Sequence, residues 1–149
     1  MLATWPSTDS RRCVLPIEYR IDHERRLVVA RGSGTLTDED VFGYQHEVWS
    51  RAEVEGYDEL VDMTDVERIA LPYADRVQDL ARLSAGMDTR YRASHLAVIA
   101  PSETAYGIGR MYQAYRGLDR QSTKQVGVFR TREEALAFLG IAEQDLSSA

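Results

Sequence analysis

The arrangement of the whole chain depends on the segment Glu59-Leu60-Val61-Asp62-Met63-Thr64-Asp65. Its apolar residues follow a turn-like stretch at residues 55–58 and give way to polar residues, which is typical of a short buried strand bounded by turns. We therefore predict that this segment is the central strand of a small sheet, with Asp62, Thr64 and Asp65 near its carboxyl end.

Length and charge limit the classes of function. The chain has 149 residues, most simply one domain, and its 44% hydrophobic and 28% charged residues are ordinary for a soluble globular protein. A net charge of -6 opposes binding to nucleic acid and to anionic membrane surfaces, because both depend on Lys and Arg side chains. The sequence has no apolar run long enough to span a bilayer and no secretory signal, so we expect a cytoplasmic protein.

Four further segments have the character of strands. Apolar and charged residues alternate over residues 17–22, which predicts an outer strand with one exposed face. The apolar run at residues 27–30 predicts its hairpin partner. The runs at residues 96–100 and 126–129 predict two more strands, which gives a sheet of five.

Helical segments separate these strands. Thr37 precedes three acidic residues and predicts an N-cap, followed by a helix whose inner stripe consists of Val41, Gln45, Val48 and Ala52. Pro72 predicts the first turn of a second helix. Gly86 is placed to end that helix in the left-handed conformation.

Two more helices follow. Ser102 begins a third helix and Gly117 ends it, and Thr131 with Glu134 matches the capping box of a fourth. The predicted order is β-β-α-β-α-β-α-β-α. Such alternation predicts an α/β fold with a mixed, mostly parallel five-stranded sheet and four helices.

The predicted domain organisation is simple. Residues 1–16 lack a clear period and are rich in Pro, Ser and Thr, so we expect an irregular N-terminal arm. Residues 17–142 form a single domain, and residues 143–149 form a frayed tail.

The element order, together with Leu60-Val61-Asp62-Met63-Thr64-Asp65-Val66, resembles the SpoIIAA-like or STAS family. The segment is similar to the apolar-Asp-apolar-Ser/Thr strand end of that family, and the resemblance covers about Ile17 to Ile141. It implies the SpoIIAA-like fold and a bacterial-type binding or regulatory module. Relatives include stand-alone proteins grouped with lipid-binding SEC14-like domains, so the resemblance implies a fold and a style of binding rather than an activity.

The chain departs from the family at the phosphorylation switch. In the anti-sigma-factor antagonists of the family, a phosphorylatable Ser opens the helix after the central strand. The comparable positions here are Ala70-Leu71-Pro72-Tyr73, and neither Leu71 nor Pro72 has a hydroxyl group. The sequence therefore supports no phosphorylation at this position.

The carboxyl ends of parallel strands are where ligands usually bind, and helix N-termini point their free amides to the same edge. The polar residues that we predict for a ligand or partner site there are Asp62, Thr64, Asp65, Ser102, Tyr106, Arg110 and Arg130. A purely structural role is the alternative, because Ser102 would cap a helix and Asp62 would bond nearby amides in any case.

Catalysis and metal binding have little support in the sequence. Asp62 and Asp65 would have to share a proton or a cation, yet residues three apart on a strand are expected on opposite faces. The three histidines are scattered, and Cys13 lies in the N-terminal arm, so neither a zinc site nor a nucleophile with its base is indicated. We expect no metal and no cofactor, and we keep an enzyme using Asp62, Asp65 and Arg130 as the disfavoured alternative.

The third predicted helix carries two further signals. Gly107 and Gly109 form a Gly-x-Gly without the third glycine of a dinucleotide fingerprint, so we expect one of them to allow close approach of helix and sheet. Large side chains of the same helix suggest either core packing or the wall of a pocket against the sheet. They are Ile108, Met111, Tyr112 and Tyr115.

Two functional hypotheses follow. The first is a non-catalytic regulatory module that acts through a protein partner or through self-association. The second is a carrier that holds a small molecule or lipid, apolar or anionic, in a pocket between the third helix and the sheet.

Overall fold

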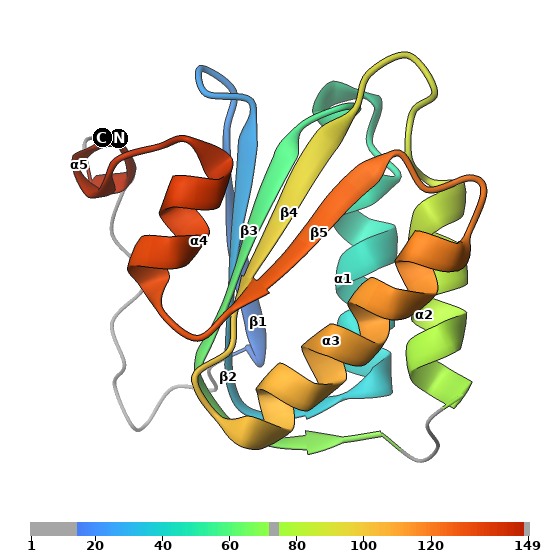
Figure 1. Cartoon of the computed structure of the whole chain (residues 1–149), viewed down its shortest axis with the longest axis vertical. Helices are drawn as coiled ribbons and strands as arrows, with labels where there is room; N and C mark the ends of the chain where they lie inside the picture. Colours follow the sequence, from blue (N-terminus) through green and yellow to red (C-terminus); the bar gives the residue numbers. More distant parts are fainter. Residues whose placement is uncertain (1–14, 72–74, 148–149) are drawn as a thin grey trace.

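A single five-stranded sheet forms the centre of the structure, a computed structural model that describes residues 15–71 and 75–147 (Figure 1). The strands lie side by side in sequence order, and β1 is antiparallel to β2 while all other neighbours are parallel. Their bounds are β1 Ile17–Asp22, β2 Leu27–Thr37, β3 Asp58–Ala70, β4 Ser94–Ile99 and β5 Lys124–Phe129. The predicted mixed, mostly parallel sheet is confirmed.

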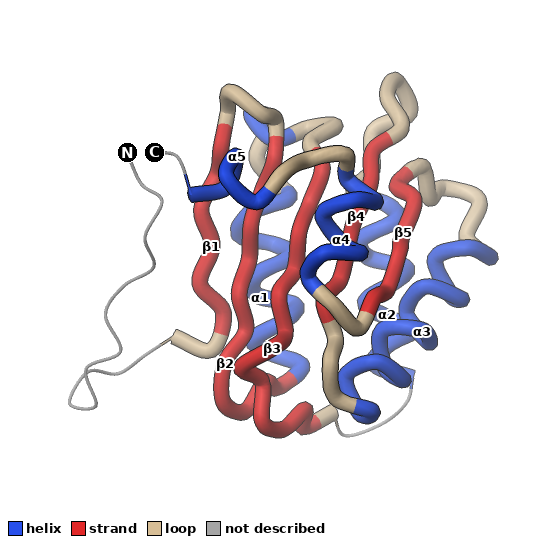
Figure 2. The backbone as a smooth tube through the Cα atoms, turned by 60° about the vertical axis from the view of Figure 1, so that its left-hand side comes forward, coloured by secondary structure: helices blue, strands red, loops and turns tan. Residues whose placement is uncertain are grey.

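Helices cover both faces of this sheet. Helices α1, α2 and α3 lie on one face, and α4 lies on the other (Figure 2). The helices are α1 Asp38–Trp49, the 3-10 turn η1 Ala52–Val54, α2 Asp75–Gly86, α3 Glu103–Leu118, α4 Arg132–Leu139 and α5 Glu143–Ser147. The parallel connections each carry a helix, as the alternation in the sequence predicts.

Three helices begin at the predicted N-caps. The side chains of Thr37, Ser102 and Thr131 each accept a hydrogen bond from the backbone N–H three residues further along, at 3.1 to 3.3 Å. Thr37 also forms a reciprocal capping box with Asp40. These local signals need no tertiary context, which is why the sequence located them.

Two helix ends differ from the prediction. Gly86 is the last residue of α2 but is not in the left-handed region, because the helix ends through backbone bonds from Met87 and Asp88 to carbonyls three residues back. Helix α3 continues past Gly117 to Leu118. The left-handed residue that closes a helix is Gly140, after α4, with φ of 73°. The predicted helix start at Pro72 lies outside the described residues.

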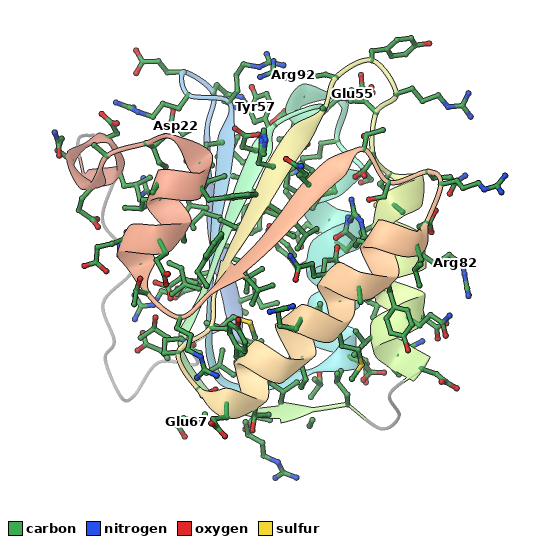
Figure 3. The ribbon with its side chains drawn as sticks, viewed as in Figure 1. Asp22, Glu55, Tyr57, Glu67, Arg82 and Arg92 are labelled. Carbon is green, nitrogen blue, oxygen red and sulfur yellow. The ribbon has the colours of Figure 1, made fainter. Side chains whose placement is uncertain are left out.

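Strands β2 and β3 are longer than predicted and extend beyond β4 as a two-stranded ribbon. Strand β4 pairs with β3 only over Glu59–Asp62, whereas β2 follows β3 as far as Ala70. Register shifts interrupt the pairing of β2 with β3, so β3 has one extra residue between Asp62 and Asp65. Glu67 on this ribbon and Tyr57 before β3 lie at opposite ends of the molecule (Figure 3).

The last segment forms part of the core. Residues Glu143–Ser147, which we expected to fray, form α5, and Leu146 is buried against the sheet face that α4 covers. Arg132 of α4 binds Glu143 through two hydrogen bonds of 2.7 and 3.1 Å. Most of the expected N-terminal arm, residues 1–14, lies outside the described residues.

Candidate functional site

The acidic residues at the end of the central strand are held by neighbouring side chains. Asp62 accepts hydrogen bonds from the N–H and hydroxyl of Thr64, at 2.9 and 2.5 Å, and from Arg132 at 3.3 Å. Asp65 accepts two hydrogen bonds from Arg31, at 3.1 and 2.5 Å. The extra residue in β3 removes the strict alternation from which we assigned these carboxylates to opposite faces, and each has its own arginine.

The other predicted site residues form a separate cluster around one aromatic ring. The guanidinium of Arg130 lies 4.2 Å from the ring centre of Tyr106, and Arg110 donates a 3.2 Å hydrogen bond to the Tyr106 hydroxyl. Ser102 caps α3. The seven predicted residues therefore divide into an Asp62 group beside α4, an Asp65–Arg31 pair, and a Tyr106 group on α3 and the β5 end.

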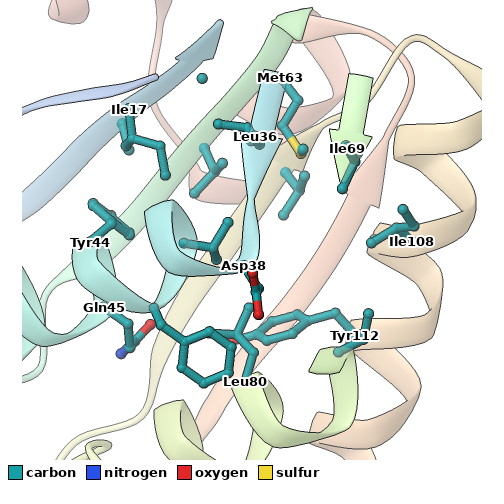
Figure 4. A pocket seen from close by; sticks show the side chains of 18 of the residues that line it. Ile17, Leu36, Asp38, Tyr44, Gln45, Met63, Ile69, Leu80, Ile108 and Tyr112 are labelled. Carbon is teal, nitrogen blue, oxygen red and sulfur yellow. The ribbon is translucent and has the colours of Figure 1, made fainter. Parts of the chain in front are cut away.

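An apolar cavity of about 140 Å³ lies between the sheet and helices α1, α2 and α3 (Figure 4). Leu36, Met63 and Ile69 are at one end, and Gln45, Leu80 and Tyr112 are at the other. The lining residues of this cavity are Ile17, Ala30, Gly32, Leu36, Asp38, Val41, Phe42, Tyr44, Gln45, Glu59, Val61, Met63, Ile69, Leu71, Arg76, Val77, Leu80, Leu96, Val98, Ile108, Gly109 and Tyr112.

The pocket suggested by the third helix is thus in the predicted place but has different walls. Ile108 and Tyr112 line it, whereas Met111 and Tyr115 do not. Most of the wall comes from α1, α2 and the β2–β3 ribbon, whose length the sequence did not reveal.

A buried ion pair lies at one side of the cavity. Glu59 binds Lys124 at 3.2 Å, and both side chains are only 7% exposed. Tyr44 donates a 2.7 Å hydrogen bond to the same carboxylate and accepts one from Trp49, whose ring is 3.5 Å from the Lys124 ammonium. Burial, reinforced by the charge of Glu59, raises the pKa of Tyr44 well above its usual value, so this hydroxyl stays protonated and donates.

A second buried network joins α2, α3 and the start of β5. Arg116 binds Asp88 at 2.5 Å and also donates to the hydroxyls of Ser84 and Tyr112, at 2.7 and 2.8 Å. Burial raises the pKa of Tyr112, and the charge of Arg116 partly opposes this effect. Asp88 also accepts hydrogen bonds from the N–H groups of Thr123 and Lys124, which fixes the start of β5.

A third ion pair on the wall of the cavity lies between the first turns of α1 and α2. Arg76 donates a 2.9 Å hydrogen bond to Asp38 and a 3.1 Å hydrogen bond to Asp79. Its guanidinium also lies 4.2 Å from the ring centre of Phe42. These contacts hold the two helices together over the apolar space.

Sequence reasoning missed the charged residues of the interior. Glu59 begins the segment that we predicted as the buried central strand. Lys124, in contrast, lies two residues before the predicted strand at 126–129, and Arg116 is not among the side chains of the third helix that we expected to face the sheet. A charge inside a predicted buried strand, such as Glu59, is a signal in itself, because buried charges are retained in pairs. The identity of the partner is not visible, since Glu59 and Lys124 are 65 positions apart.

Residues 15–71 and 75–147 contain neither a cluster suited to a metal ion nor a helix suited to span a membrane. No group of three or more His, Cys, Asp or Glu side chains in these ranges is arranged to hold a metal ion. None of the helices described there combines the length and the apolar character needed to cross a bilayer.

Comparison with known proteins identifies the fold. No protein-family model and no curated protein matches the sequence. Among solved structures, the chain is similar to an uncharacterized protein of the DUF3478 family from Shewanella loihica PV-4, which has a SpoIIAA-like fold. The two share 17% sequence identity with a TM-score of 0.55, over 86% of this chain and 97% of the other. The chain therefore has the SpoIIAA-like fold that its element order predicts.

Proposed function

We propose that the protein binds a small, largely apolar molecule in the cavity between the sheet and helices α1 to α3. The cavity itself is the observation that supports this proposal. Its volume of about 140 Å³ is comparable to that of engineered apolar cavities, roughly 150 Å³, that take up benzene. Apolar side chains around a space of this size gain van der Waals contacts when an apolar ligand fills it.

The chemistry of the wall supports the same function. Most lining side chains are aliphatic or aromatic, and the charged ones are neutralised within the protein: Glu59 by Lys124, and Asp38 by Arg76. Such a site favours ligands that are mostly hydrocarbon. The regulatory hypothesis, with a protein partner or self-association, stays a prediction, and the cavity gives the carrier hypothesis the more specific support.

Titration with 1-hexanol, a small and mostly hydrocarbon molecule, tests the proposal. In ¹H–¹⁵N correlation spectra, amides next to the cavity should shift saturably, including those of Leu36, Ile69 and Ile108. The blocking variant Ile108→Trp fills the space and should abolish the shifts. Met111→Trp is the matched control, because Met111 belongs to the same helix but does not line the cavity.

Circular dichroism and a urea titration would first establish that both variants fold. The proposal fails if hexanol causes no saturable shift in the wild-type protein. It also fails if Ile108→Trp binds hexanol as well as Met111→Trp does.

A further inference from the structure

Among the polar side chains on the cavity wall, one lacks a strong hydrogen-bond partner among the described residues, and this indicates which kind of ligand would fit. Six such side chains line the cavity, namely Asp38, Tyr44, Gln45, Glu59, Arg76 and Tyr112. Five of them are held by oxygen or nitrogen partners at 2.7 to 3.2 Å. Gln45 is the exception.

The side chain of Gln45 is largely buried and has one weak hydrogen-bond partner. The residue is 9% exposed and lies on the inner stripe of α1 with Val48. Its Nε2 donates to the thioether sulfur of Met87 at 3.3 Å, and sulfur is a weak acceptor. Within the described part of the chain, this is the one hydrogen bond that the Gln45 side chain makes.

A glutamine at this position therefore calls for a reason beyond packing. A leucine fits the same helical stripe and has no polar group to desolvate. Gln45 lies at the end of the cavity with Leu80 and Tyr112, so the unpaired end of its amide is next to the space that a ligand would fill (Figure 4). A ligand with a matching polar group would satisfy the amide on binding.

We propose, on the basis of the cavity function above, that the ligand is an uncharged molecule with a hydroxyl group that hydrogen-bonds to Gln45. The amide nitrogen of Gln45 is bonded to Met87, which leaves the amide oxygen unpaired within the ranges that the structure describes, and a hydroxyl can donate a hydrogen bond to that oxygen. A carboxylate is disfavoured, because the wall is mostly apolar and its cation, Arg76, is already paired with Asp38, so a buried carboxylate would have no free counter-charge. An ammonium group is disfavoured as well, because both acids on the wall, Glu59 and Asp38, have their own cations.

Three probes of nearly equal size separate these chemistries: 1-hexanol, 1-methoxypentane and hexanoate. The ether has the same number of heavy atoms as the alcohol but cannot donate a hydrogen bond. Dissociation constants from ¹H–¹⁵N titrations should rank hexanol as the tightest, about tenfold ahead of the ether, which is the order of magnitude of one buried hydrogen bond. Hexanoate at pH 7 should bind more weakly than both.

Two variants assign the preference to Gln45. Gln45→Leu should still bind the ether, while the ratio of the ether's dissociation constant to that of the alcohol falls from about ten to about one. Met87→Leu is the matched control, because it removes the sulfur partner and leaves the amide, so the preference for the alcohol should remain. If Gln45 only links α1 to the loop after α2, the ratio of the two dissociation constants should be the same in both variants.

The outcomes distinguish this inference from the proposed function. If hexanol and 1-methoxypentane bind the wild-type protein equally well, the cavity binds ligands but Gln45 does not select them, and the inference is overturned. An unchanged ratio in Gln45→Leu overturns it too. If none of the three probes binds, the proposed function fails and the inference fails with it.

Discussion

Lys124 and Glu59 illustrate how much a single pair of residues contributes inside this fold. Both side chains are only 7% exposed, and their 3.2 Å contact is supported by the Tyr44 hydroxyl and by the ring of Trp49. Removing two charges from water is costly, and only the mutual attraction of the pair and its hydrogen bonds offset that cost. Loss of one member of the pair should therefore destabilise the protein more than loss of both.

Replacement of Lys124 tests this reasoning. Lys124→Met leaves the Glu59 carboxylate buried without its cation and should lower the free energy of unfolding by about 3 kcal/mol. In the double variant Glu59→Gln, Lys124→Met the buried charge is gone, and Tyr44 still has an acceptor. Urea titrations at pH 7 should therefore find the double variant more stable than Lys124→Met alone. If the second substitution lowers stability further, the buried charge is not the origin of the loss.

At the scale of elements, the contact of α3 with the sheet depends on one glycine. A Cβ atom added to Gly109 would lie 2.9 Å from Cγ1 of Val128, whereas a Cβ at Gly107 would meet no atom within 4 Å. The prediction that one of these glycines allows close approach of helix and sheet is confirmed for Gly109. The position of α3 matters for the cavity, because Ile108 and Tyr112 on this helix line it.

The two glycines form a matched pair for mutation. Gly107→Ala should raise the free energy of unfolding by roughly 0.5–1 kcal/mol, since alanine favours helix and the site is open. Gly109→Ala has the same gain in helix propensity but forces α3 away from the stiff Val128 side chain, so a net loss of about 1–2 kcal/mol is expected. Equal effects of the two substitutions, measured by urea unfolding, would contradict the close contact.

At the scale of the whole molecule, short segments of the sequence were enough to predict the fold, whereas the cavity depends on contacts between residues that are far apart in the chain. The N-caps Thr37, Ser102 and Thr131 and the apolar strand at Leu60 are visible within a few residues of sequence, and they were sufficient to give the element order. The cavity instead depends on the extension of β2 and β3 beyond β4, which arises from pairing between strands. The same holds for the Arg116–Asp88 pair, whose members are 28 positions apart.

The extended ribbon also makes the molecule uneven in stability. Residues Leu60 to Asp62 of β3 have hydrogen-bonded neighbours on both sides, β2 and β4. Beyond Asp65, the strand pairs with β2 alone, and Leu36 and Ile69 of the ribbon line the cavity. The outer part of the ribbon thus depends on whatever fills the cavity more than the centre of the sheet does.

Hydrogen exchange followed by mass spectrometry tests this coupling. In the ligand-free protein, amides of residues 66–70 should exchange about tenfold or more faster than those of Leu60 to Asp62, because local opening of the ribbon breaks fewer contacts. Saturating 1-hexanol should slow exchange in residues 66–70 and leave peptides of α4 nearly unchanged, since α4 covers the opposite face of the sheet. Uniform slowing across the protein would mean that the ligand stabilises the fold as a whole, without a special dependence of the ribbon on the cavity.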